Sequence, residues 1–450
     1  MSFGHGPVSR RRAAGSRHDG PVSQAAEVLT PAGAELLSRL RGVAVTPDAA
    51  LQLAEELREQ YPPSLVAAAL TQRSLRIAAA AKFSRADEMF FTRAGLEQAS
   101  PELAARHSAS RFAGLDLVAD LCCGIGGDLV ALAGAARSVL AVDSDPEAIA
   151  FARRNVAVSE PTASVVFVCA DVRDLALGAG EALPHGFSAA RALPPGYRRE
   201  DVQGVFIDPA RRDGGRRLRA GDSHPPLDWC LTLAEQLPRV CIKAAPGLPR
   251  ELVPPGWEAE FVAIGRDLKE ALLWSPAFAS TKRRATVLSA VATGKVSGRA
   301  EVQPDAETLV SEPGAEVPVA DPGQYLLDPN PAVTRAGLVA ELGHRLGAWQ
   351  IDPMIAFLSL DQPVSTPFAR TLRILQSMPW HERRVAQRLR DLGIGSAELR
   401  RRGLAGDVEQ IRRRLGLAGD RAATIVLTRR RDRPWCLICE SVSDADTRTS

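Results

Sequence analysis

Between residues 112 and 292, short apolar runs alternate with amphipathic stretches. The apolar runs have the length of buried strands, and the stretches between them place apolar residues at the three- and four-residue spacing of a helix. The predicted strands are Leu115–Leu121, Ser138–Val142, Ser164–Cys169, Gln203–Ile207 and Val240–Lys243. The predicted helices are Asp128–Ala136, Pro146–Ala157 and Pro226–Leu237. Strands that alternate with helices in this way predict an α/β fold built on a mainly parallel, doubly wound sheet.

The alternation ends after Leu252. Three strand-like runs then follow with no helical pattern between them: Trp257–Ile264, Glu270–Ser275 and Arg284–Ala290. Consecutive strands without a crossover helix predict an antiparallel hairpin at the edge of the sheet. An insert rich in Gly, Pro and Ala, Gly178–Arg199, predicts a mobile loop.

Helical patterns fill residues 26–111, in front of the alternating region. Asp48–Glu59 and Ser64–Ala81 carry apolar residues at helical spacing, and Pro62-Pro63 separates the two stretches. Ser100-Pro101-Glu102 has the form of a helix start, with serine at the N-cap and proline at the first helical position. We therefore expect an N-terminal helical region.

Three phenylalanines, Phe83, Phe90 and Phe91, cluster near the end of this region, in a chain with 5% aromatic residues. Our favoured interpretation is that they form core between the helical region and the α/β domain. The alternative is a lid, or a surface on which a nucleic-acid base could stack.

Residues 293–323 are rich in Gly, Pro and Glu and predict a linker. Residues 324–442 predict an α+β unit, with helices near Pro331–Leu346, Trp380–Asp391, Ser396–Arg402 and Asp407–Leu415 and strands at Ala423–Thr428 and Pro434–Glu440. The expected division is a disordered tail at 1–25, the helical region at 26–111, the α/β domain at 112–292, the linker at 293–323, the α+β unit at 324–442 and a second tail at 443–450.

The composition is that of a globular protein, with 45% hydrophobic and 24% charged residues. No apolar run reaches the ~18 residues of a membrane span, and no apolar segment of a secretory signal follows the first basic residues. The seven cysteines are odd in number and lie mostly in strand-like runs, which predicts reduced thiols in the cytoplasm. We interpret Cys436 and Cys439 as buried strand residues, not as a zinc or redox pair. We expect no membrane association and no metal.

The net charge of +3 is unevenly distributed. The segment Arg370–Arg433 holds 17 arginines and 7 acidic residues, a net charge of +10, which leaves −7 for the rest of the chain. Such a segment indicates an anionic partner, with nucleic acid as the first candidate. A solvated helical surface is the simpler alternative. The excess of arginine over lysine, 51 to 5, weakens the electrostatic argument because it also fits a compositional bias.

The strongest chemical signal is Asp120-Leu-Cys-Cys-Gly-Ile-Gly-Gly-Asp128, which follows a predicted strand and opens a predicted helix. Its glycines allow a tight turn, and the N-terminus of the helix favours an anionic group. Asp143 ends the next strand, 16 residues after Gly127, where a carboxylate can accept hydrogen bonds from a ribose. This arrangement indicates a nucleoside-containing cofactor. The dinucleotide fingerprint would need glycine at Leu129, so NAD is the least favoured cofactor.

With Asp120 in front of the turn, the motif resembles that of class I methyltransferases dependent on S-adenosyl-L-methionine (SAM), with Cys122 in place of the first glycine. The resemblance implies a Rossmann-like fold. It also implies that Asp120 contacts the methionine end of SAM, Asp143 the ribose and Asp171 the adenine edge. The full set of cofactor-binding residues that it implies is Asp120, Cys122, Gly124, Gly126, Gly127, Asp143, Ser144, Asp171 and Val172.

The fourth predicted strand ends in Asp208-Pro209-Ala210-Arg211, which resembles the Asp-Pro-Pro-Tyr motif of amino-methylating enzymes. The resemblance implies that Asp208 and Pro209 orient an acceptor, while Arg211 replaces the aromatic residue that would stack on a base. The motif also resembles that of uridine-5 RNA methyltransferases, which need a cysteine nucleophile. Cys241 lies inside a predicted strand, so we favour direct displacement over a covalent mechanism. Arginines from Arg211 to Arg217 could hold phosphate, or form a solvated loop.

The C-terminal unit resembles the THUMP-like domain of a bacterial methyltransferase family, a resemblance that extends over residues 82–440 and includes MFFTRAGLEQAS at Met89–Ser100. It implies a methyltransferase that acts on a base in structured RNA, tRNA or rRNA, with the basic C-terminal domain as the RNA contact. Alternatives are a small-molecule or protein methyltransferase, and a non-catalytic RNA-binding protein with a vestigial SAM fold.

Overall fold

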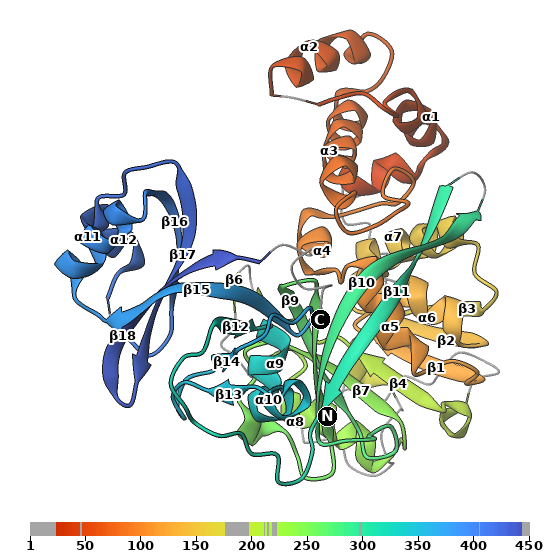
Figure 1. Cartoon of the computed structure of the whole chain (residues 1–450). Coiled ribbons are helices and arrows are strands. Elements are labelled where there is room, and N and C mark those ends of the chain that lie inside the picture. The colour runs from red at the N-terminus through yellow and green to blue at the C-terminus, as the bar shows by residue number, and fades with distance from the viewer. Residues whose placement is uncertain are drawn as a thin grey trace, which may run out of the picture.

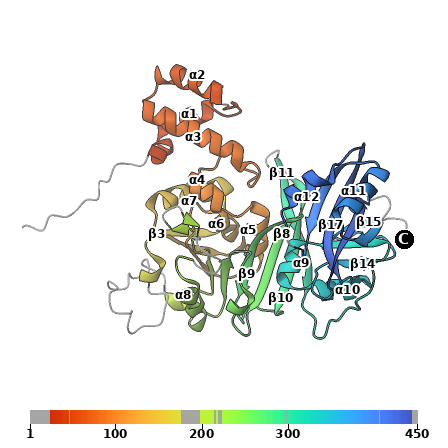
Figure 2. The ribbon, with the colours of Figure 1, turned by 90° about the vertical axis from the view of Figure 1, so that its left-hand side faces the viewer.

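The structure is a computed structural model that describes residues 24–45, 47–175, 198–210, 212–213, 216–217, 223–296, 299–404 and 406–442. An N-terminal helical region stands on one end of a central α/β domain, and a C-terminal domain lies at its side (Figures 1 and 2). Much of the predicted loop Gly178–Arg199, together with Arg211 and both predicted tails apart from Gln24 and Ala25, lies outside the described residues.

The central sheet has, within the described residues, the strand order β11-β10-β8-β9-β7-β4-β1-β2-β3. Its strands are β1 (Leu117–Leu121), β2 (Ser138–Asp143), β3 (Ser164–Cys169), β4 (Gly204–Ile207), β7 (Val240–Ala244), β8 (Glu258–Ile264), β9 (Asp267–Trp274), β10 (Arg283–Val296) and β11 (Arg299–Val310). The five strands from β7 to β3 are parallel, as predicted. The Val, Ile and Leu side chains of β1, β2, β4 and β7 are buried on both faces of the sheet, which explains the apolar runs in the sequence, whereas the edge strand β3 is only partly buried.

Helices cover both faces of this sheet, which confirms the doubly wound architecture. One face packs against α5 (Glu102–Ser110), α6 (Gly127–Ala135) and α7 (Pro146–Ser159). The other packs against α8 (Leu227–Thr232), the 3-10 turn η4 (Leu233–Glu235) and the C-terminal helices α9 (Pro331–Ala336) and α10 (Val339–Leu346). Further short elements are η2 (Val172–Asp174), η3 (Arg199–Asp201), η5 (Arg250–Leu252) and the small ladder of β5 (Arg212–Asp213) with β6 (Arg216–Arg217).

The edge of the sheet beyond β7 is larger than the sequence predicted, and it is mixed because β10 pairs parallel with β8. Strands β8 and β9 form the expected hairpin, and β9 also pairs antiparallel with β7. The prediction of a linker at 293–323 is wrong for its first half, because β10 continues to Val296 and β11 pairs with it from Arg299 to Val310. The hydrogen bonds of this ladder come from the backbone, so they form here despite the weak periodicity of the side chains.

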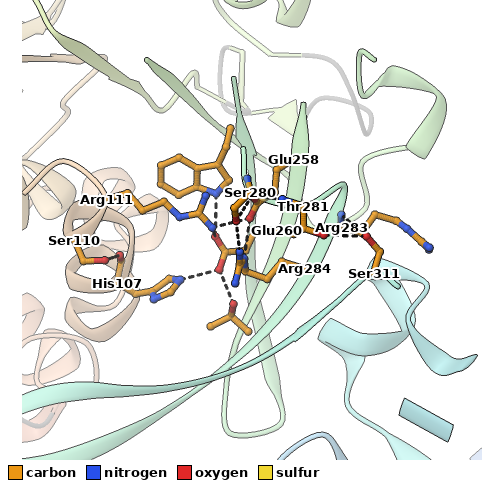
Figure 3. Close-up of polar contacts among 12 residues, drawn as sticks. His107, Ser110, Arg111, Glu258, Glu260, Ser280, Thr281, Arg283, Arg284 and Ser311 are labelled. Atoms are coloured by element: carbon orange, nitrogen blue, oxygen red, sulfur yellow. Dashed lines mark hydrogen bonds and ion pairs between the residues drawn. The ribbon is translucent and has the colours of Figure 1, made fainter. Parts of the chain in front are cut away.

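Helix α5 is attached to this edge by a cluster of buried polar side chains (Figure 3). The guanidinium of Arg111 lies 2.6 Å from Glu258 Oε1 and 3.1 Å from Glu260 Oε2, and it sits over the ring of Trp274. His107 Nε2 lies 2.8 Å from Glu260 Oε1. Burial alone would raise the pKa of Glu260, but His107, Arg111 and a hydroxyl donor lower it to about 2. The carboxylate is therefore held ionised inside the protein.

The N-terminal helical region consists of η1 (Gln24–Leu29), α1 (Pro31–Arg39), α2 (Pro47–Arg58), α3 (Pro63–Ala79), α4 (Arg93–Gln98) and α5. Phe83 and Phe91 are buried in its core, and Phe90 stacks on Phe151 of α7 at a ring distance of 5.9 Å. This confirms core packing as the role of the cluster. The predicted N-cap is wrong. Pro101 occupies that position, and the hydroxyl of Ser100 instead donates to Glu270 Oε2 at 2.9 Å.

The C-terminal domain contains a sheet whose described strands have the order β13-β14-β12-β15-β18-β17-β16. Its elements are β12 (Tyr325–Pro329), α9 (Pro331–Ala336), α10 (Val339–Leu346), β13 (Trp349–Gln350), β14 (Leu358–Leu360), β15 (Ala369–Pro379), α11 (Glu382–Asp391), β16 (Ile394–Arg401), α12 (Val408–Leu415), β17 (Arg421–Arg430) and β18 (Arg433–Ser441). The predicted helix Ser396–Arg402 is wrong, because this segment pairs parallel with β17 as β16. The predicted helix Pro331–Leu346 is divided by Gly337, whose φ is +69°.

This domain is tied to the central sheet around Asp328, which is 2% exposed. Its carboxylate accepts from Arg266 of the β8–β9 turn at 2.9 Å and from Arg402, next to β16, at 3.1 Å. Asn330 Nδ2 also donates to the carbonyl of Gly265 at 2.8 Å. The Arg266–Asp328 ion pair and the Asn330 hydrogen bond join the two domains, so separating the domains would leave the buried Asp328 with Arg402 as its ion-pair partner and would remove both contacts with the central sheet. The contact therefore fixes the orientation of the C-terminal domain relative to the central sheet.

Candidate active site

The carboxyl ends of β1, β2 and β4 meet at one edge of the central sheet, beside the N-terminus of α6. A cavity of about 310 Å³ lies there, where ligands bind in open parallel sheets. Its walls include the predicted residues Asp120, Cys122, Gly124, Gly127, Asp143, Ser144, Asp171, Val172, Asp208 and Pro209. The structure thus brings most of the predicted site together around a single cavity, while Arg211 is outside the described residues.

The glycine loop between β1 and α6 needs unusual backbone geometry. Cys122 has φ +62° and Gly126 has φ +89°, both in the left-handed region that favours glycine. A side chain on Gly126 would come within 3.3 Å of the Cα of Ala152, whereas one on Gly124 would meet only open space. Gly124 therefore presents bare backbone to the cavity, and Gly126 lets the loop pack against α7. Cys122 adopts, at some strain, the conformation for which related motifs use glycine.

Asp120 is the most unusual group of the cavity wall. It is 1% exposed, and neither of its carboxylate oxygens has a hydrogen-bond partner. Burial, together with the nearby Asp128 and Asp208, raises the pKa of Asp120 well above its ordinary value. A buried carboxylate without a partner is costly unless a ligand satisfies it. An ammonium group in the cavity would do so, and the amino group of a bound methionine moiety has this chemistry.

Asp143 connects the end of β2 to the glycine loop. Its Oδ2 accepts from the backbone N–H of Gly124 at 2.8 Å and its Oδ1 from that of Asp145 at 2.9 Å. Burial raises the pKa of Asp143, and these backbone donors oppose the shift. The carboxylate is consequently fixed in place at the cavity wall, next to Ser144.

Asp171 reaches the cavity but is paired within the chain. The side chain of Arg173 donates to it, with Nη2 at 2.6 Å from Oδ2, and holds the pKa of Asp171 below its ordinary value. This partner, two residues away, was not predicted. Any contact of Asp171 with a ligand would be made by a carboxylate already oriented by Arg173.

Lys243, which was not predicted as a site residue, contacts Asp208. Its Nζ donates to Asp208 Oδ2 at 2.6 Å and to Asp128 Oδ2 at 2.9 Å, and its side chain is 3% exposed. Lys243 is the penultimate residue of the apolar strand β7, in a chain with five lysines. A lysine at the carboxyl end of a buried strand was the available signal, because buried lysine is rare without a charged partner.

The N-terminal region supplies a wall of the cavity through α4 and the residues beside it, including Thr92, Gln98 and Ala99. Lys82 Nζ holds the end of α4, donating to the carbonyls of Leu96 at 2.7 Å and Ala99 at 2.9 Å. The alternative interpretation of this segment was a lid or a surface on which a nucleic-acid base could stack. The segment is a packed wall, whose phenylalanines point into core.

The cysteines show no sign of catalytic use. Cys241 is fully buried in β7, and burial raises its pKa well above the ordinary value, which agrees with the preference for direct displacement. Cys436 and Cys439 are both buried and belong to different core clusters, as expected for strand residues. All seven cysteines are free thiols.

No metal-binding cluster of His, Cys, Asp and Glu is found in the described part of the chain. None of its described helices is long and apolar enough to cross a membrane.

Comparison with known proteins gives three family matches. Residues 118–183 match a family described as a methyltransferase domain, and residues 369–441 match one described as THUMP domain-like. Residues 21–79 match a domain of unknown function.

Two relatives from Mycobacterium tuberculosis, strains CDC 1551 / Oshkosh and ATCC 25618 / H37Rv, are each 36% identical over 348 residues. The match covers 76% of this chain and 85% of each relative, and both are described as uncharacterized S-adenosylmethionine-dependent methyltransferases. A crystal structure of a candidate methyltransferase from Porphyromonas gingivalis W83 has a TM-score of 0.65 at 19% identity. It covers 89% of this chain and 100% of that chain, which shows a shared fold.

Proposed function

Because the chain belongs to the S-adenosylmethionine-dependent methyltransferase family of its mycobacterial relatives, we propose that it methylates a nitrogen of a base in structured RNA. It is an enzyme with SAM as its cofactor, a class I methyltransferase sheet and a C-terminal THUMP-like domain. The RNA acceptor, tRNA or rRNA, and the roles of the individual residues below are parts of the proposal.

The observation that carries the proposal is the buried, unpaired carboxylate of Asp120 beside the bare backbone of Gly124. It fits the ammonium group of SAM, with Cys122, Gly126 and Gly127 shaping the turn beneath the methionine. Asp143 and Ser144 would hold the ribose, and Asp171 and Val172 the adenine. When bound, SAM supplies an electrophilic methyl group on a sulfonium leaving group.

The acceptor half of the site begins at Asp208 and Pro209, at the end of β4. Asp208 would accept a hydrogen bond from the acceptor N–H, and the carbonyl of Pro209 would fix the orientation of the base. Arg211 would complete this half by holding a phosphate of the RNA. The chain's residues thus align the nitrogen and exclude water, as direct displacement requires.

The RNA part of the proposal rests on the THUMP-like domain and on the arginines of its two helices. Arg383, Arg384 and Arg390 on α11 are exposed, as are Arg412 and Arg413 on the neighbouring α12. Exposed guanidinium groups on adjoining helices suit contact with a phosphate backbone. A cytoplasmic location is part of the same proposal and agrees with the seven free thiols.

The test is incubation of the enzyme with methyl-labelled SAM and either total RNA or a protein extract. We expect label in RNA, lost after ribonuclease treatment and absent with Asp208→Ala. Label in protein alone, or in small molecules alone, would contradict the RNA acceptor while leaving the methyltransferase assignment intact. No transfer to any fraction, with SAM still bound, would favour a non-catalytic RNA-binding protein.

A further inference from the structure

Lys243 lies at the centre of a buried group of charges under the cofactor cavity. Besides its contacts with Asp208 and Asp128, its Nζ is 4.0 Å from Glu270 Oε2 on β9. Ser100 and Ser108 donate to the two oxygens of Glu270 at 2.9 and 3.3 Å. The ammonium therefore touches groups from α6, β4 and β9, which approach it from three directions.

Carboxyl groups outnumber cations in this group. Asp120, Asp128, Asp208 and Glu270 face a single ammonium, and Asp120 has no hydrogen-bond partner. Burial would lower the pKa of Lys243, but Asp128, Asp208 and Glu270 reverse the effect and raise it. Lys243 is accordingly a permanent cation at physiological pH and has no proton to exchange. Lys243 must therefore act by positioning the carboxylates that contact its ammonium group.

We propose that Lys243 is a positioning residue that links the two halves of the active site. Its ammonium fixes the carboxylate of Asp208, which orients the acceptor, and the same ammonium fixes Asp128 at the start of α6, the helix that follows the glycine loop. This inference rests on the proposed role of Asp208 in the methyl transfer, but not on RNA as the acceptor.

A lysine suits this place better than an arginine. Its ammonium is a compact point charge with three donors, which can meet carboxylates arriving from different directions. The guanidinium of arginine is a planar fork that favours two parallel bonds to one carboxylate. We therefore expect Lys243→Arg to keep the charge but misplace Asp208.

The direct test compares Lys243→Met and Lys243→Arg with the exposed control Lys282→Met, using methyl transfer to whichever acceptor the wild-type enzyme labels. Because displacement of a reacting group by about 1 Å can cost on the order of 100-fold, we expect kcat to fall about 100-fold in Lys243→Met and about 10-fold in Lys243→Arg. KM for SAM should change less than about threefold, since Asp120 and Gly124 remain. The control should match the wild type.

The pH profile separates positioning from a merely structural role. Without the ammonium, Asp208 would face Asp120, Asp128 and Glu270, with Asp143 and Lys82 farther off, and like charges raise the pKa of a carboxylate. The kcat of Lys243→Met should therefore increase with pH, whereas the kcat of the wild type and of Lys243→Arg should not change with pH. A folded Lys243→Met variant that has the wild-type kcat, with no change in kcat as the pH changes, would overturn the proposal.

Loss of a buried charge partner can prevent folding, so a second measurement uses substitutions of the two carboxylates that contact Lys243. Asp128→Asn and Asp208→Asn keep the shape of both side chains. If the two carboxylates act through a shared ammonium, the effects of the two substitutions on kcat should be non-additive in a double-mutant cycle. Additive effects would overturn the proposal even if no Lys243 variant folds. If the wild type labels no acceptor at all, the proposed function fails and the proposal for Lys243 fails with it, whereas additive effects in an active enzyme overturn the proposal for Lys243 alone.

Discussion

Replacement of Asp120 by asparagine should weaken SAM binding and stabilise the free protein at the same time. The asparagine side chain would keep the shape of the aspartate but could not pair with an ammonium as an ion. A hydrogen bond to a charged group contributes about 1.5–3 kcal/mol, so we expect a SAM affinity about 10- to 150-fold lower. A carboxyl group whose pKa is raised on folding lowers stability at neutral pH, and asparagine lacks this ionisation, so the melting temperature of the free protein should rise.

The pH dependence follows from the raised pKa of Asp120. In the free protein burial favours the protonated acid, whereas an ammonium in the cavity favours the carboxylate, so binding releases a proton. Wild-type affinity should therefore increase with pH until the pH passes the pKa of the free protein, and Asp120→Asn should lack this dependence. Calorimetry in buffers of different ionisation enthalpy measures the released proton directly.

The matched control is Asp116→Asn, four residues earlier, where the carboxylate is exposed and pairs with Gln203 and Arg137. It should change neither SAM affinity nor the melting temperature measurably. If Asp120→Asn binds SAM within about twofold of the wild type, the assignment of the methionine end of the cavity is refuted. A lower melting temperature would mean that Asp120 is satisfied within the protein.

Three further outcomes follow from the structure. Gly126→Val should abolish SAM binding in calorimetry, because the substitution requires φ +89° and would press on Ala152, and retained affinity would contradict the loop geometry. Glu260→Gln should lower the free energy of unfolding by about 3–5 kcal/mol in denaturant titrations. Since the pKa of Glu260 falls from 4.5 to about 2 on folding, its contribution should be present above about pH 4.5 and disappear toward pH 2, and a variant with the wild-type acid transition would refute this. Arg383→Glu with Arg384→Glu should weaken RNA binding in filter assays at least 10-fold and reduce its salt dependence, without altering SAM affinity.

The wall of the cavity proposed to hold the cofactor could be predicted because its residues follow one another along the chain. A strand, a glycine turn, a helix and a second strand place Asp120, Gly124 and Asp143 by local geometry alone. Lys243 was missed for the opposite reason: Asp128 and Asp208 are 115 and 35 residues away, and only the sheet order brings them to it.

The wrong assignments have a related cause. The Ser396–Arg402 stretch and the second half of the β10–β11 hairpin carry weak or helix-like side-chain patterns. Each becomes a strand because a neighbouring strand offers backbone hydrogen bonds along its length. Pairing of this kind depends on distant segments, which local periodicity does not report.

The ion pair between Asp328 of the C-terminal domain and Arg266 of the central sheet has a consequence for substrate choice. It holds the THUMP-like domain against the edge of the central sheet, while α11 and α12 lie on the part of that domain away from the contact (Figure 1). Under the proposed function, an RNA must extend from the cavity to these helices to use both. The enzyme would then select substrates by their length and folded shape. A short oligonucleotide that contains the acceptor base but ends before α11 would be a poor substrate even with the correct local sequence.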